Sequence, residues 1–193
     1  MSDITWHGGH LSRPERWAAL GHSGATIWLT GLSGSGKSTI AAAAEALLLG
    51  SGRPAYMLDG DNLRHGLNAG LGFSAEDRDE NVRRVGEVSL LMADAGTVAM
   101  VCLISPFRAG RDRARAAHAA AGLPFFEVWV NTPIEVCRQR DPKGLYAKAE
   151  AGAIRSFTGV DSPYEEPLQP ELEIRTDEID LDEAAARVIR LLG

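Results

Sequence analysis

The chain has 193 residues, 45% of them hydrophobic and 24% charged, which is enough for one domain with a sizeable core and too few for two. Its 20 Lys and Arg against 26 Asp and Glu give a net charge of −6, which argues against non-specific nucleic-acid binding, because that binding depends on neutralising phosphates. No apolar run approaches membrane-spanning length, no signal-peptide layout is present, and the 2 cysteines lack a CxxC spacing. We therefore expect a cytoplasmic protein without a membrane partner.

Strand-like and helix-like segments alternate along the chain. Residues 1–24 are polar and predict an extended arm with one short helix near Arg13–Leu20, and residues 25–193 predict a single domain. The elements expected in that domain are, in order, a strand at 26–30, a helix at 40–49, a strand at 55–58, a helix at 81–95, a strand at 97–104, a helix at 108–121, a strand at 125–130, a helix opened by Pro133, a strand at 172–174 and a helix at 181–192. This order predicts an α/β fold with a mostly parallel sheet and helices on both faces.

A glycine-rich segment after the first predicted strand matches the phosphate-binding pattern G-x-x-x-x-G-K-[ST] in full. Glycines let the backbone curl so that successive N–H groups point at phosphate, and the helix that follows adds its N-terminal dipole. We expect Lys37 to reach the β- and γ-phosphates, Ser38 to ligate Mg²⁺, and Thr39 to contact the α-phosphate. The loop residues are Gly31, Leu32, Ser33, Gly34, Ser35, Gly36, Lys37 and Ser38. The flanking strand and helix favour a three-layer P-loop NTPase or kinase fold that binds ATP over an incidental glycine-rich turn.

Two carboxylates follow the strand predicted at 55–58. Alternate residues of a strand face the same way, so Asp59 and Asp61 are expected to face one site. One would hold the metal's water shell, and the other would orient or deprotonate an attacking hydroxyl. We assign the Mg²⁺ to Ser38 and Asp61, partly through water. An ordinary Asp-Gly turn is the alternative, which the neighbouring P-loop disfavours.

Four arginines lie in the segment after these carboxylates. The chain lacks the Asn-Lys-x-Asp guanine motif of GTPases, and its small size favours a kinase for a small acceptor. Arg64 and Arg78 are suited to clamp a phosphate or sulfate, and Phe73 between them can stack on a base. Arg83 and Arg84 are as readily explained as part of a solvated helix face.

With these motifs the sequence resembles the adenylylsulfate kinase (APS kinase) family over nearly the whole chain. A P-loop is shared by many families, whereas Asp-Gly-Asp-Asn-x-x-Arg followed by Asp-Pro-Lys-Gly-Leu-Tyr is far more specific. Trp6-His7 and Leu20-Gly21-His22 in the arm also match, and Phe107 departs from the Tyr of many relatives. The matching segments are 27–39, 58–64, 71–74, 78–84, 104–108, 140–146 and 157–165.

The resemblance implies a reaction and its participants. The γ-phosphoryl of ATP would move to the 3′-hydroxyl of adenosine 5′-phosphosulfate (APS), giving PAPS and ADP in sulfate assimilation. Mg²⁺ would be required, with ATP as co-substrate. A homodimer is usual in the family, and fusion to or association with ATP sulfurylase is a further option.

The resemblance also assigns roles to individual residues. The adenine of APS would stack between Phe73 and Phe157, and residues about 138–160 would form a lid that excludes water, with a plain pair of surface helices as the alternative. The implied catalytic residues are Lys37, Asp61 and Ser105; Arg138 and Arg140 would join the loop in binding ATP; and the acceptor would contact Asp59, Asp61, Arg64, Phe73, Arg78, Asn81, Ile104, Ser105, Lys143 and Phe157.

Ser105 has two readings. Bacterial members of the family are described with a phosphoserine at this position, whereas direct in-line transfer needs no covalent intermediate. The residue follows a buried strand at its carboxyl end, where α/β sheets place their sites, so we expect Ser105 to line the site.

Two other functions compete with this one. A P-loop kinase for a different nucleotide or a sugar acid would share most motifs, but the two arginines around Phe73 favour a nucleotide-like anion. A non-catalytic, regulatory nucleotide-binding domain would be expected to lose Lys37 or both aspartates, and all three are present.

Overall fold

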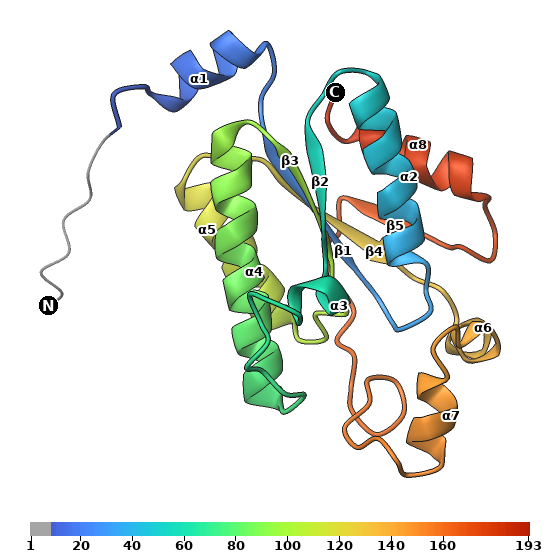
Figure 1. The fold of residues 1–193 in the computed structure, drawn as a ribbon. Coiled ribbons are helices and arrows are strands. Elements are labelled where there is room, and N and C mark those ends of the chain that lie inside the picture. Colours follow the sequence, from blue (N-terminus) through green and yellow to red (C-terminus); the bar gives the residue numbers. More distant parts are fainter. Residues whose placement is uncertain (1–8) are drawn as a thin grey trace, which may run out of the picture.

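A five-stranded parallel sheet organises the chain. The computed structural model describes residues 9–193, and Figure 1 shows the sheet with helices on both of its faces. The strand order is β2-β3-β1-β4-β5, and every neighbouring pair is parallel. The strands are β1 (Ala25–Thr30), β2 (Ala55–Asp59), β3 (Val98–Cys102), β4 (Phe125–Val130) and β5 (Leu172–Ile174).

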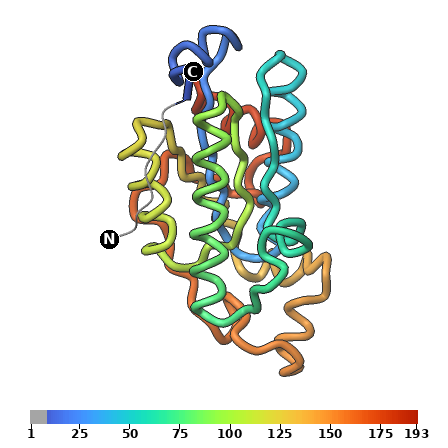
Figure 2. The backbone as a smooth tube through the Cα atoms, turned by 60° about the vertical axis from the view of Figure 1, so that its left-hand side comes forward, coloured from blue at the N-terminus to red at the C-terminus, as the bar shows by residue number. Residues whose placement is uncertain are grey.

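Two pairs of helices complete the three layers. The longest helices, α2 and α4, lie on opposite faces of the sheet; α2 packs beside α8, and α4 packs beside α5 (Figures 1 and 2). The arrangement confirms the predicted α/β P-loop fold. The helices are α1 (Arg13–Leu20), α2 (Lys37–Gly50), α3 (Gly60–Leu63), α4 (Ala75–Ala95), α5 (Arg108–Ala120), α6 (Ile134–Arg140), α7 (Leu145–Glu150) and α8 (Leu181–Arg190).

The central strand β1 explains why its sequence is a continuous apolar run. Successive side chains of a strand point to opposite faces, and both faces here are covered. Ile27 and Leu29 pack in the core under α2 and α8, whereas Trp28 packs in the core under α4 and α5. All six residues of β1 are buried, which fixes the P-loop that follows at the middle of the sheet.

The described part of the arm packs on the domain. Arg13 and Arg16 of α1 both pair with Asp94 near the end of α4, at 2.7 and 2.8 Å. The predicted boundary between arm and domain at residue 24 stays a prediction, and Trp6 and His7 lie outside the described residues. No helix within residues 9–193 is long and apolar enough to cross a membrane.

Four elements depart from the sequence-based expectation. Helix α4 begins at Ala75 instead of residue 81, because Ser74 caps it by accepting from the Asp77 amide at 3.1 Å. The short helices α3 and α7 were not expected, because each has too few residues to show a helical period. The strand expected at 97–104 ends at Cys102, and its last two residues belong to a loop.

Gly24 tests the contact between β1 and α4. A Cβ at Gly24 would lie 2.1 Å from the Ala93 carbonyl oxygen, so the backbone itself would have to move. We expect Gly24→Ala to lower the free energy of unfolding by about 1–3 kcal/mol in urea denaturation. Gly50→Ala is the matched control, since nothing lies within 4 Å of its Cβ position and its stability should be unchanged or slightly higher. Equal effects of both substitutions would contradict the tight contact.

Candidate active site

The P-loop leaves β1 and enters α2 through a backbone path that requires glycine. Gly31 has φ 147°, and a Cβ there would lie 2.5 Å from the Val130 carbonyl oxygen on the next strand. Gly36 has φ 104° and forms the N-cap of α2 without a side-chain hydrogen bond, so the first helical N–H groups face the loop interior. These amides and the helix dipole form an anion-binding site.

The side chain of Lys37 lies against the backbone of the P-loop. Its Nζ donates to the carbonyl oxygens of Gly31 at 2.9 Å and Leu32 at 2.7 Å, and only 8% of the residue is exposed. Burial lowers the pKa of Lys37 to about 8, and neighbouring anionic groups such as Asp59 oppose the shift. The loop therefore holds a cation at its centre, where phosphate oxygens would stabilise the charge.

Asp59 is the carboxylate that meets the P-loop. The Ser38 hydroxyl donates to Asp59 Oδ2 at 2.6 Å, while Asp59 Oδ1 accepts from the Asp61 amide at 2.9 Å as the N-cap of α3. Because β2 ends at Asp59, Asp61 lies on α3 and the expected alternation along one strand is wrong. The Asp61 carboxylate instead pairs with Lys143 of the lid.

The Ser38–Asp59 pair fits a magnesium ion better than the pair assigned from sequence. Both groups offer the hard oxygen atoms that Mg²⁺ prefers, and the ion usually binds one or two carboxylates together with waters and substrate phosphates. Within residues 9–193 no three His, Cys, Asp or Glu side chains cluster around a common point. Asp59, rather than Asp61, contacts the Ser38 hydroxyl.

Two arginines and an exposed aromatic ring were expected to bind the acceptor, and the structure gives their surroundings. Arg64 donates to the carbonyl oxygens of Leu71 and Gly72, and its guanidinium carbon lies 4.1 Å from the centroid of the Phe73 ring. Phe73 is 62% exposed, so its ring is available for stacking. Burial, followed by the charge of Arg64, lowers the pKa of Arg78. Two neighbouring cations favour an anion between them.

Asn81 and Phe157, which the resemblance assigns to the acceptor, are both buried. Asn81 Oδ1 accepts from Asn68 Nδ2 at 2.9 Å, and both residues are buried. Phe157 packs edge-on against Tyr146 with ring centroids 5.0 Å apart, inside the core of the lid. The stacking of adenine between Phe73 and Phe157 therefore stays a prediction.

Ser105 is buried beneath the site. Its exposed fraction is 3%, and its Oγ accepts from Trp28 Nε1 at 3.1 Å and donates to Thr30 Oγ1 at 3.0 Å. The neighbouring Ile104 carbonyl accepts from Thr30 Oγ1 at 2.7 Å. The hydroxyl is thus engaged by Trp28 and Thr30, and both interpretations of Ser105 stay predictions.

The lid packs directly on the P-loop. Tyr146 of the lid donates to the Ser33 carbonyl at 3.0 Å, and Thr176, which follows β5 outside the lid, donates to the Ser35 carbonyl at 3.0 Å. Arg140 reaches Thr176 with hydrogen bonds of 2.7 and 3.0 Å to its hydroxyl and carbonyl. Arg138, by contrast, pairs with Glu150 within the lid at 3.4 Å. These contacts join the segment to the P-loop, and its role as a lid stays a prediction.

Sequence reasoning missed three residues of this arrangement. Asn68, Thr132 and Thr176 carry no motif, and their positions in the sequence give no sign that they lie beside the site. Thr132 donates to the Ser35 carbonyl at 2.9 Å and contacts Thr176 at 2.7 Å, which only the folded chain reveals.

A buried P-loop lysine, a carboxylate at the carboxyl end of β2 that contacts the loop, and a segment packed on the loop together define a P-loop kinase for a small acceptor. The family model described as adenylylsulphate kinase matches residues 23–175, and the chain belongs to that family.

The similarity extends over almost the whole chain. The adenylyl-sulfate kinase of Saccharomyces cerevisiae is 54% identical over 191 residues, which cover 99% of this chain and 94% of the relative. That of Shewanella amazonensis is 54% identical over 192 residues, which cover 100% and 96%. A solved structure of the Mycobacterium tuberculosis APS kinase in complex with AMPPNP and APS matches with a TM-score of 0.86 at 56% identity, covering 89% of this chain and 98% of that chain.

The low pKa of Lys37 predicts a specific pH dependence. The lysine loses its charge as pH rises through about 8, and the phosphates of bound nucleotide would raise its pKa again. We expect kcat/KM for ATP, which reports the free enzyme, to fall above about pH 8, while kcat at saturating ATP persists to higher pH. Initial rates at fixed ionic strength measure both profiles. Identical basic limbs in the two profiles would contradict the assignment to Lys37.

Proposed function

We propose that the protein transfers the γ-phosphoryl of ATP to the 3′-hydroxyl of adenosine 5′-phosphosulfate, giving PAPS and ADP in sulfate assimilation. The family and the relatives support this reaction. The observation within the chain that carries the acceptor assignment is the pair Arg64 and Arg78 beside the exposed Phe73. Two guanidinium groups match a phosphosulfate, and the ring matches a base.

The P-loop would hold the donor. Loop amides at the start of α2 would donate to the phosphate oxygens, and the Lys37 ammonium would exchange the Gly31 and Leu32 carbonyls for phosphate oxygens. Arg140 donates to Thr176, which in turn donates to the P-loop. Arg140 would therefore hold the nucleotide from the lid side. Ser38 and Asp59 would hold Mg²⁺, which when bound neutralises charge on the transferring phosphoryl group.

The lid would join donor and acceptor. Lys143 pairs with Asp61, and Arg78 of α4 donates to Thr158 at 2.9 Å, so both ends of the lid contact residues assigned to the acceptor. We assign Asp61 the orientation of the 3′-hydroxyl, in direct in-line transfer that excludes water. The homodimer and association with ATP sulfurylase stay predictions from the family resemblance, and the cytoplasmic location stays a prediction from the sequence.

The acceptor assignment is tested by ADP release with ATP and Mg²⁺. We expect turnover with adenosine 5′-phosphosulfate and little with AMP, adenosine or gluconate, because these lack the sulfate or the base that the site recognises. Preferred turnover of gluconate or another acceptor would keep the kinase and overturn the family-specific substrate. ATP binding without turnover of any acceptor would favour the regulatory alternative.

Arg78 and Arg83 provide a matched pair on α4. Arg78→Ala removes a charged donor from the acceptor side, so we expect KM for adenosine phosphosulfate to rise about ten- to hundredfold with KM for ATP nearly unchanged. Arg83 pairs with Glu80 on the exposed helix face, at 2.6 Å, so Arg83→Ala should leave both constants near their original values. A similar rise in KM for both variants would contradict the anion clamp.

A further inference from the structure

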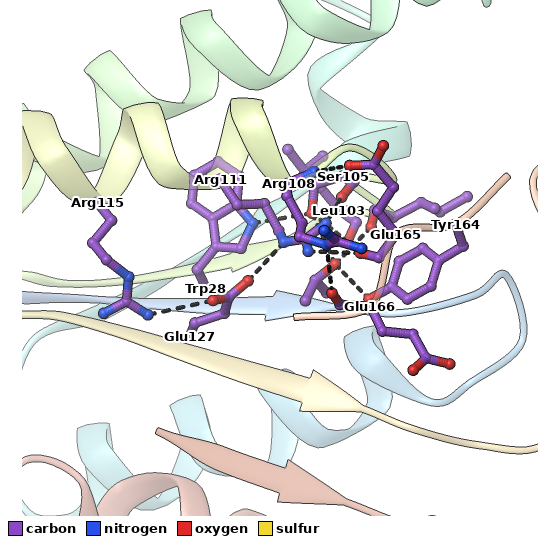
Figure 3. A network of polar contacts seen from close by, with 12 residues as sticks. Trp28, Leu103, Ser105, Arg108, Arg111, Arg115, Glu127, Tyr164, Glu165 and Glu166 are labelled. Carbon is purple, nitrogen blue, oxygen red and sulfur yellow. Dashed lines mark hydrogen bonds and ion pairs between the residues drawn. The ribbon is translucent and has the colours of Figure 1, made fainter. Parts of the chain in front are cut away.

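Arg111 is a buried cation that the proposed reaction does not use. It lies on α5, is 1% exposed, and donates through Nε to Glu127 Oε1 on β4 at 2.6 Å (Figure 3). Glu127 is also buried, with 5% of its surface exposed. Burying an ion pair costs desolvation that an apolar pair would avoid, so stability alone is a weak explanation for it.

The remaining donors of Arg111 reach main-chain carbonyls of two other segments. Nη1 donates to the Ser105 carbonyl at 2.6 Å, in the loop that follows β3. Nη2 donates to the Glu165 carbonyl at 2.7 Å, in the segment that returns from the lid. Figure 3 shows the side chain lying between these partners. One guanidinium therefore connects β4, the loop after β3 and the segment that follows the lid.

The segments of Ser105 and Glu165, which Arg111 joins, both contact residues beside the P-loop. Ser105 has φ 40°, a left-handed conformation that a non-glycine residue adopts only when its surroundings enforce it. The Glu165 amide donates to the Pro106 carbonyl at 2.8 Å, and the adjacent Tyr164 hydroxyl contacts Thr30 Oγ1 at 3.0 Å. Thr30 immediately precedes the P-loop, so the return of the lid is anchored beside the start of that loop.

We propose that Arg111 is a positioning residue for phosphoryl transfer. It fixes the returning end of the lid against the loop after β3, so that the nearby Thr158, which Arg78 contacts, closes on the acceptor in one geometry. The planar fork of arginine allows three directed hydrogen bonds at once, which lysine cannot reproduce. This role rests on the proposed function, because the closure it describes is that of the acceptor site.

Arg115 provides a matched control on the same helix. It binds the same Glu127 at 3.3 Å and Glu171 at 2.6 Å, and its hydrogen bonds go to these carboxylates instead of the two segments. Arg111→Lys and Arg115→Lys therefore make the same chemical change around one carboxylate. Only the first removes the link between the lid and the loop after β3.

The test compares steady-state kinetics of the two variants with the unsubstituted protein. We expect Arg111→Lys to raise KM for adenosine phosphosulfate about tenfold or more, and to release more ADP than PAPS because water competes in a loosened site. Arg115→Lys should stay within about twofold for both quantities. Unchanged KM and coupling in Arg111→Lys, or equal changes in both variants, would overturn the positioning role.

Hydrogen exchange tests the same link without substrate. In Arg111→Lys, amides of residues 103–107 and 157–166 should exchange faster, whereas Arg115→Lys should leave them unchanged. This measurement separates the proposed reaction from the proposed role of Arg111. A protein that fails to phosphorylate adenosine phosphosulfate would overturn the reaction, and the exchange rates would still decide the role of Arg111. Unaltered exchange in both segments would overturn that role.

A second variant covers the case in which Arg111→Lys does not fold. Arg111→Met with Glu127→Met removes the buried pair together, an exchange that other proteins tolerate, and it deletes the same two carbonyl contacts. Raised KM and faster exchange at 157–166 would support the proposal. A folded double variant with unaltered KM, coupling and exchange would overturn it.

Discussion

The buried ammonium of Lys37 is the interaction on which the site depends. It needs carbonyl oxygens in place of water, and the P-loop backbone supplies those of Gly31 and Leu32. Two other segments bind the same backbone, since Tyr146 of the lid donates to the Ser33 carbonyl and Thr176 after β5 donates to the Ser35 carbonyl. The carbonyls of the loop are thus occupied by the protein itself, which leaves its amides for an anion.

A series of contacts runs from the P-loop, which would bind the donor, to Asp61, which is assigned to the acceptor. Ser38 lies at the start of α2 and contacts Asp59, and Asp59 in turn caps the short helix that carries Asp61. Lys143 pairs with Asp61 from the lid. A nucleotide held by the loop and a hydroxyl held near Asp61 are therefore positioned by one connected set of short contacts. In-line transfer depends on such positioning more than on any reactive group of the protein.

Much of this architecture follows from local sequence patterns. The P-loop spacing, the apolar run of β1 and the order of strands and helices each carry enough local information to predict an α/β kinase fold, and the structure agrees. The arginine pair could also be predicted from the sequence, since Arg64, Phe73 and Arg78 lie within one segment.

The remaining details depend on where the chain turns. Asp59 and Asp61 were expected on one strand, but β2 ends at Asp59. Asp61 lies on a four-residue helix, where it pairs with Lys143. Ser105 was expected to line the site, which stays a prediction, and its hydrogen bonds with Trp28 and Thr30 could not be foreseen from the sequence. These outcomes, like the reach of Arg111 to Glu165, arise from contacts between distant segments, which composition and spacing do not encode.

A single-turnover experiment with ATP labelled in its γ-phosphoryl group tests the account most directly. Enzyme in excess of labelled ATP would be mixed with Mg²⁺ and adenosine phosphosulfate, quenched at short times, and its protein and nucleotide fractions separated. Direct transfer predicts that the label passes into the 3′-phosphate of the product without first appearing on the protein. Label that accumulates on Ser105 before product forms, or that appears only as inorganic phosphate, would contradict direct transfer between the two bound nucleotides.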